Sequence, residues 1–369
     1  MTPYALPLLG ILLLAAHASQ AAPAHKTSLD AIWLTASSQN YSEASAIYQM
    51  VENTWKDQPQ AAGRTAFSRN RFAMGMRERW VSLEYIERND WLFNFSPDTA
   101  QLLYLEGSDQ PIPPAREYDV DLEVQQLTAR GLRVGFHLPE WQNIQLITYF
   151  SVLQGRDFQE GRLHGNVLQP APGDYQGQAQ LNYHYSEDLL LEHQVNTPRG
   201  RGGAVDIELH WQAERWQASL VAEDLWMQMK WDDAGRSQGR LNTNNTEYND
   251  SGFVRYKALF SGTRGIDEFR QQRLPVMTRG SLSWNGERQQ LTVGAWHYYD
   301  ELFPFFTLNQ QLTEHGKLIA GYEFNSDKIT LGYHHQQQHG HIAIQLGADD
   351  TNLRYARALE LTIRMGYRF

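Results

Sequence analysis

The chain has 369 residues, a formal net charge of −10 and no cysteine. The acidic balance argues against a nucleic-acid-binding protein, because that function needs clustered Lys and Arg. The lack of cysteine excludes thiol catalysis, zinc–thiolate sites and iron–sulfur clusters.

The first residues have the pattern of a secretory signal peptide. An apolar run from Leu6 to Ala16 is followed by small residues, with Ala16-His17-Ala18 as the best cleavage site. We therefore predict a cleaved signal peptide over residues 1–18, with cleavage as late as residue 22 as an alternative. The run is too short for a membrane-spanning helix, which needs roughly 20 residues.

Residues 23–63 differ from the rest of the chain and predict a separate N-terminal segment, either periplasmic or plug-like. Asn40 and Glu43 have the spacing of a capping box, and apolar residues follow at helical intervals. These features predict one amphipathic helix near residues 41–56. Three placements stay open for it: the lumen of a barrel, its periplasmic rim, or a loose extension.

From about residue 70 to the end, apolar residues recur at every second position, which predicts β-strands. Tight turns are predicted at residues 129–131, 213–215, 285–286 and 325–327, where Asn285-Gly286 is a strong hairpin signal. Long loops are predicted at residues 107–117, 155–175, 232–251 and 262–275, with 231–251 as the best external loop because it lacks apolar periodicity.

These strands favour a closed transmembrane barrel over a soluble β-sandwich, which would also alternate. They are long, tight turns alternate with longer polar loops, and aromatic residues stand at strand ends. We predict an all-β fold: an antiparallel up-and-down barrel of about 14 strands (12 to 16) over residues 64–369.

The last nine residues, Leu361 to Phe369, place every apolar side chain on one face of a strand that ends in an aromatic residue. This strand resembles the closing strand of Gram-negative outer-membrane β-barrels with a porin-like architecture. The resemblance implies an outer-membrane location and identifies Tyr367 and Phe369 as the signal read by the barrel-assembly machinery. It also implies outer-membrane lipid and lipopolysaccharide as partners, and it reaches no specific family.

Charged residues at the alternate positions are predicted to line the lumen, where they would select solutes by charge or pair across strands to stiffen the wall. Both roles stay open. The predicted lumen-lining residues are Asp119, Asp121, Glu123, Arg133, His137, Asp206, Glu208, His210, Glu360, Arg364 and Arg368.

A histidine-rich stretch is the best metal-binding candidate, with His334, His335, His339 and His341 as weak ligand candidates. A solvated polar turn is the alternative, and no cofactor is predicted. The nearest fragments of catalytic patterns are Glu192-His193 and Asp349-Asp350. Neighbouring residues on a strand face opposite ways, so these fragments do not predict a catalytic site.

The leading prediction is therefore a non-enzymatic outer-membrane pore, passive or selective for small polar solutes. The alternative is a non-conducting assembly or interaction barrel that binds an envelope partner or a polysaccharide. A lipid- or glycan-modifying outer-membrane enzyme is the weaker alternative.

Overall fold

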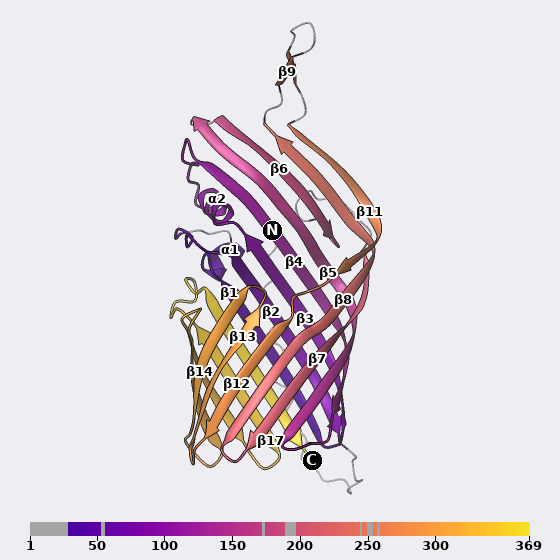
Figure 1. Ribbon diagram of the computed structural model, residues 1–369, viewed down its shortest axis with the longest axis vertical. Coiled ribbons are helices and arrows are strands. Elements are labelled where there is room, and N and C mark those ends of the chain that lie inside the picture. The colour runs from indigo at the N-terminus through magenta and orange to yellow at the C-terminus, as the bar shows by residue number, and fades with distance from the viewer. Residues whose placement is uncertain are drawn as a thin grey trace, which may run out of the picture.

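The computed structural model describes residues 29–52, 56–171, 174–188, 197–243, 246–248, 254–256 and 259–369. Within these residues, sixteen strands form one antiparallel sheet, and fourteen of them close into a barrel, as Figure 1 shows. The predicted fold class is confirmed. The predicted signal peptide lies outside the described residues.

The fourteen barrel strands follow one another around the ring in chain order. They are β1 (Ala31–Ser42), β2 (Thr65–Glu78), β3 (Val81–Phe95), β4 (Glu117–His137), β5 (Ile144–Ala171), β7 (Arg199–Ala213), β8 (Trp216–Asn242), β12 (Met277–Asn285), β13 (Gln289–Tyr298), β14 (Glu301–Gln311), β15 (Gly316–Glu323), β16 (Lys328–Gln336), β17 (Gly340–Ala348) and β18 (Ala358–Arg368).

The remaining elements lie outside the ring. Strands β6 (Asp174–Tyr185) and β11 (Phe260–Gln272) extend the same sheet, and β9 (Thr246–Tyr248) pairs with β10 (Val254–Tyr256). The helices are α1 (Ile47–Glu52) and α2 (Pro97–Gly107). Neither described helix has the length and hydropathy needed to cross a membrane.

Strand β1 closes the barrel, which corrects the predicted domain boundary. It pairs with β18 on one side and with β2 on the other along nearly its whole length. Residues 23–63 are therefore not a separate segment ahead of a barrel that begins at residue 64. The prediction was wrong because small and polar residues such as Ser37 and Ser38 occupy both faces of β1, so its apolar alternation is weak. A short helix, α1, does lie within the predicted range 41–56, in the connection from β1 to β2.

The barrel strands present an apolar face outward and a more polar face inward. We call the outward apolar surface the apolar belt; its large side chains are exposed, and no described residue covers them. It includes Met74, Leu83, Leu132, Phe150, Leu220, Leu282, Val293, Leu318, Leu331, Ile344 and Met365. A closed barrel satisfies every backbone hydrogen bond along its wall, so such a surface fits contact with lipid.

The two ends of the barrel differ in their connections. At one end β2 and β3 are joined by two residues, and β7 and β8 by two residues, which confirms the predicted turn at 213–215. At the other end residues 43–64 connect β1 to β2 and residues 96–116 connect β3 to β4. Short turns are typical of the periplasmic end and long connections of the external end, so we assign the ends accordingly.

On one side of the molecule the sheet continues beyond the barrel. Strands β4, β5 and β8 have 21, 28 and 27 residues, and their upper parts form a curved sheet with β6 and β11. We call this sheet the external wall; it rises above the ends of the other strands in Figure 1. Within the predicted loops, residues 155–171, 174–175, 232–242 and 262–272 are therefore strands. The loop predicted at 107–117 is present between α2 and β4.

The predicted turn at residues 129–131 was also wrong, since these residues lie inside the continuous strand β4. Gly131 allows β4 and β5 to approach closely, because a Cβ at this position would lie 2.0 Å from the Val152 carbonyl oxygen. The glycine serves strand packing and not a turn.

Helix α2 covers the outer face of β4 in the external wall. Ser96 caps the helix by accepting a hydrogen bond of 3.1 Å from the Thr99 N–H, and Pro97 follows in the first turn. Tyr104 and Leu105 of α2 then pack on Tyr118, which is fully buried. The outer face of this part of the wall is thus occupied, and its inner face is open.

Candidate functional site in the barrel lumen

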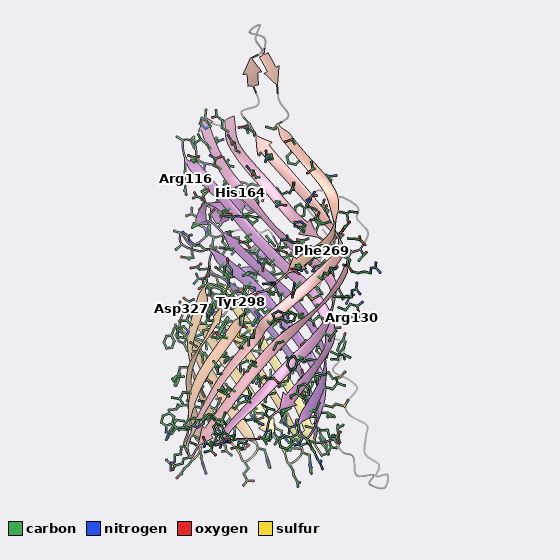
Figure 2. All side chains as sticks on the ribbon, turned by 45° about the vertical axis from the view of Figure 1, so that its right-hand side comes forward. Arg116, Arg130, His164, Phe269, Tyr298 and Asp327 are labelled. Atoms are coloured by element: carbon green, nitrogen blue, oxygen red, sulfur yellow. The ribbon has the colours of Figure 1, made fainter. Side chains whose placement is uncertain are left out.

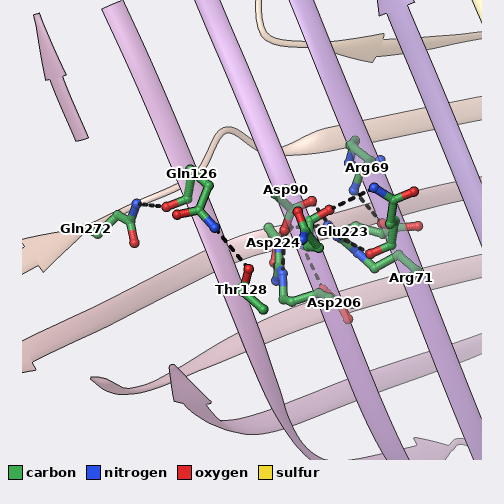
Figure 3. A network of polar contacts seen from close by, with 12 residues as sticks. Arg69, Arg71, Asp90, Gln126, Thr128, Asp206, Glu223, Asp224 and Gln272 are labelled. Atoms are coloured by element: carbon green, nitrogen blue, oxygen red, sulfur yellow. Dashed lines mark hydrogen bonds and ion pairs between the residues drawn. The ribbon is translucent and has the colours of Figure 1, made fainter. Parts of the chain in front are cut away.

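The centre of the lumen holds a cluster of buried charges, drawn in Figure 3. We call it the central cluster. It comprises Arg69, Arg71, Arg88, Asp90, Asp206, Glu223 and Asp224. The cations come from β2 and β3, and most of the carboxylates come from β7 and β8, so the ion pairs join opposite parts of the wall.

Two of these ion pairs cross the lumen directly. The Arg88 guanidinium donates two hydrogen bonds of 2.7 Å to the two carboxylate oxygens of Asp224, and both side chains are less than a tenth exposed. Arg69 donates a bond of 2.7 Å to Glu223. Strands β3 and β8 are separated by three strands around the ring, so these ion pairs reach across the lumen and do not join neighbouring strands.

An irregularity in the wall positions the acidic side of the cluster. The register between β7 and β8 shifts between Val205 and Ile207, opposite Asp224, whose φ is 56°. The Asp224 N–H donates a hydrogen bond of 2.8 Å to the Asp206 carboxylate. This local bulge brings three carboxylates, Asp206, Glu223 and Asp224, to one place in the wall.

Aromatic side chains also cross the lumen beside the central cluster. Phe67 on β2 contacts Tyr298 on β13, with ring centroids 5.2 Å apart, and these strands are diametrically opposite in the ring. Trp296 stacks on Phe303 at 3.9 Å, and Tyr41 meets Phe303 edge-on at 4.9 Å. We call these five residues the aromatic cluster. Together with the central cluster they span the lumen at this level.

Towards the external end, an apolar group lies on the same inner face. Phe158 and Trp231 stack at 4.4 Å and are fully buried with Leu127 and Met229. The Trp231 indole N–H donates a hydrogen bond of 3.2 Å to Gln272. This group joins the external wall to the barrel and adds packing above the central cluster.

The structure places the sequence-predicted lumen residues in two different regions. Eight of them face the barrel lumen by strand alternation: Arg133, His137, Asp206, Glu208, His210, Glu360, Arg364 and Arg368. Asp119, Asp121 and Glu123 instead lie on the inner face of the external wall, above the barrel. Arg133 binds Glu84 and Asp206 across the wall, so some of the predicted inward charges do pair between strands.

Six of the seven residues of the central cluster were not predicted: Arg69, Arg71, Arg88, Asp90, Glu223 and Asp224. The predicted Asp206 is bound by Arg133 and by the Asp224 N–H. Charged residues at alternate positions of β2 and β3 were the available signal. Strand alternation alone does not show which of them meet across a lumen.

A groove of about 420 Å³ lies on the inner face of the external wall. It is lined by polar side chains, among them Asp119, Asp121, Arg162, His164, Asn166, Gln178 and Gln180. Arg162 holds Asp121 by two hydrogen bonds of 2.8 and 2.7 Å, and these bonds lower the pKa of the Asp121 carboxyl. The groove faces the space above the lumen.

The histidine-rich stretch forms the ends of β16 and β17 at the periplasmic end. His334 and His341 face the lumen with ring centroids 6.0 Å apart, whereas His335 stacks on Tyr333 on the opposite face. His339 stacks on Tyr367. In the part of the chain that the structure describes, no three His, Cys, Asp or Glu side chains gather as metal ligands. The four histidines thus do not converge.

One serine–histidine pair lies in the lumen, but it lacks the third group that nucleophilic catalysis uses. His137 Nε2 and Ser82 Oγ are 3.1 Å apart, and His137 Nδ1 is buried without a hydrogen-bond partner among the described residues. His210 contacts Glu208 at 3.2 Å. The non-enzymatic character of the protein stays a prediction.

No family model matches the chain, and no curated protein is similar to it. Solved structures with a related fold include the toluene transporter TodX of Pseudomonas putida, which is 7% identical, with 92% of this chain and 88% of that chain covered at a TM-score of 0.44. A FadL homologue of Pseudomonas aeruginosa is 7% identical, with 92% and 90% covered at a TM-score of 0.41. The translocator domain of the autotransporter NalP of Neisseria meningitidis is 6% identical, with 94% and 90% covered at a TM-score of 0.30.

The closed wall and the apolar belt decide the class of protein. The chain is a β-barrel of the Gram-negative outer membrane. No specific family is identified, so the function must be argued from this chain's own residues. Tyr367 and Phe369 lie at the periplasmic end with ring centroids 5.2 Å apart, and their role as an assembly signal stays a prediction.

Proposed function

We propose that the protein is an outer-membrane transport barrel whose lumen is closed at rest by the central and aromatic clusters and opens to let solutes pass. One observation carries the proposal: the contacts that close the lumen are made by side chains of the wall strands themselves. Polar inner faces lie above and below this level, in the groove of the external wall and in the periplasmic half. A permanently open passive pore does not fit the cross-lumen contacts.

The energetics of the central cluster support a closed resting state. Removing one partner of a buried ion pair leaves a charge without compensation and costs about 3–5 kcal/mol. Opening must therefore move both partners together or replace their contacts with those of a solute. A solute that offers hydrogen bonds at this level would lower that cost.

Liposome swelling tests the proposal. We expect proteoliposomes with the native protein to admit small neutral sugars slowly, and the double variant Arg88→Ser/Asp224→Ser to admit them faster, because it removes a cross-lumen pair without leaving an unpaired charge. The matched control is Arg162→Ser/Asp121→Ser, which removes a bidentate pair of the same geometry from the external wall. Equal, negligible swelling for all three folded proteins would contradict transport.

A second function is favoured by the groove of the external wall. Carboxylate, guanidinium, imidazole and amide groups lie side by side there on a surface open to solvent, and such groups bind polyhydroxylated ligands. The interaction-barrel alternative would use this groove to hold an envelope polysaccharide. Glycan-array binding that is lost in Arg162→Ser/Asp121→Ser, with swelling of the central-pair variant unchanged from native, would favour it over transport. Point variants are needed for this test, because deleting the N-terminal residues 23–63 would remove barrel strand β1.

A further inference from the structure

The lumen between the central cluster and the periplasmic turns is positively charged, although the chain as a whole carries −10. We call this region the lower lumen. Inward-facing cations there are Arg77, Arg279, Lys317, Arg364 and Arg368. Arg133 and Glu84 also face this region and bind each other, so their charges cancel. The remaining inward-facing carboxylate at these levels is Glu208, which contacts His210. Among the described residues, this leaves an excess of four inward-facing cations in the lower lumen.

These five cations have no carboxylate partner at ion-pair distance within the described residues, in contrast to Arg133 and to the cations of the central cluster. Arg77 Nε is buried without any hydrogen-bond partner there. Arg279 lies over the ring of Phe305, with its guanidinium carbon 4.6 Å from the ring centroid. The guanidinium groups therefore keep donors that the protein does not use.

Two of these guanidinium groups approach from opposite walls. Arg279 is on β12 and Arg364 is on β18, with five strands between them along the shorter way around the ring. By strand alternation both side chains face the lumen on the periplasmic side of the central cluster. Glu360, on the same face of β18 as Arg364, is already bound to Lys328 at 2.8 Å. Two like charges thus point into the same part of the lumen, an arrangement that a bound anion would stabilise.

We infer that the lower lumen binds small anions, namely oxyanions and carboxylates, between Arg279 and Arg364, with Arg77 as a further donor. Planar guanidinium groups match the oxygen spacing of these anions and bind them bidentately. As a statement about the transported solute, the inference rests on the proposed function. As a statement about anion binding, the inference rests only on the residues of the lower lumen.

Titration calorimetry of the full-length folded protein with inorganic phosphate at low ionic strength tests the site. We expect binding that weakens about threefold in Arg279→Gln or Arg364→Gln and about tenfold in the double variant. Arg130→Gln is the matched control, because it removes the same charge from the outward face of β4. The double variant also relieves repulsion between like charges, so it should fold at least as well as the native protein.

Reversal potentials measured across a KCl gradient give an independent second reading in the background Arg88→Ser/Asp224→Ser. We expect anion selectivity there, shifted towards cations when Arg279→Gln/Arg364→Gln is added and unchanged with Arg130→Gln. Phosphate binding without conductance in any variant would overturn the transport proposal and leave the anion site standing. If the Arg279/Arg364 variant and the Arg130 control bind phosphate alike, or if neither they nor the native protein bind it, the anion site is overturned.

Discussion

The two sides of this barrel follow different rules. On the short side, strands β12 to β18 have 8 to 11 residues, alternate apolar and polar side chains, and end near the level of Asp327, as Figure 2 shows. On the tall side, β4, β5 and β8 continue into the external wall, where Arg116 and His164 lie well above that level. Alternation of apolar and polar side chains therefore indicates that a strand contacts lipid, and a strand can form without it. Where both faces of a sheet meet water or a covering helix, the pattern fades.

The largest expected contrast is between the buried and exposed ion pairs. Asp224→Ala should destabilise the barrel by about 3–5 kcal/mol, because it leaves Arg88 buried without its bidentate partner. Asp121→Ala on the external wall should cost below about 1 kcal/mol, since Arg162 stays hydrated there. Equilibrium unfolding in urea, followed by the heat-dependent gel mobility of the folded barrel, measures both. Equal costs would show that the central cluster is not buried from water.

The outward faces of the two sides should respond differently to charge. Leu331→Arg, in the apolar belt on β16, should cost about 2–4 kcal/mol on folding into vesicles, because it places a cation in hydrocarbon. Ile266→Arg, on β11 of the external wall, is similarly exposed and should change stability by less than about 0.5 kcal/mol. A comparable loss at both positions would mean that the wall also lies in the membrane.

Glycines offer a smaller test of how closely the strands of each side pack. Gly131→Ala on β4 should cost about 1–3 kcal/mol, because the added methyl group meets the Val152 carbonyl oxygen. Gly280→Ala on β12 should be close to neutral, since its nearest neighbour, a Leu220 methyl group, would lie 4.0 Å away. The same urea titration compares them, and a larger loss at Gly280 would contradict the close approach of β4 and β5.

The smallest effect concerns pH and the external wall. Hydrogen bonds from Arg162 lower the pKa of Asp121 below its unfolded value of about 3.9, so the pair adds stability above that value and loses it as pH falls through the lowered pKa. A double-mutant cycle on Asp121 and Arg162 should give a coupling below about 1 kcal/mol at pH 7 and close to zero near pH 2. Coupling that grows on acidification would refute this pairing.

The sequence predicted the barrel because lipid imposes the same alternation on every strand that crosses it. It also predicted the strand number and the turn at residues 213–215, where the local signals of turn residues and flanking apolar runs agree. It failed at β1 and in the external wall for the same physical reason. There small or polar side chains interrupt the apolar ones on the outward face, so strands such as β1 and β11 have no sustained apolar periodicity.

The candidate site was predictable only in part. Inward charges such as Asp206 and Arg364 follow from alternation, which fixes the face of each residue. Their partners do not, because Arg88 and Asp224 are 136 residues apart and meet only through the curvature of the closed wall. The bulge at Asp224, which turns three carboxylates towards one point, has no distinct signature in the sequence.

Single-channel recording in planar bilayers tests most directly whether the central cluster closes the lumen. We expect the native protein to stay closed for most of the recording and Arg88→Ser/Asp224→Ser to show long, discrete open steps, while Arg162→Ser/Asp121→Ser behaves like the native protein. A native protein that is permanently open, or a central-pair variant as silent as the native one, would contradict the account.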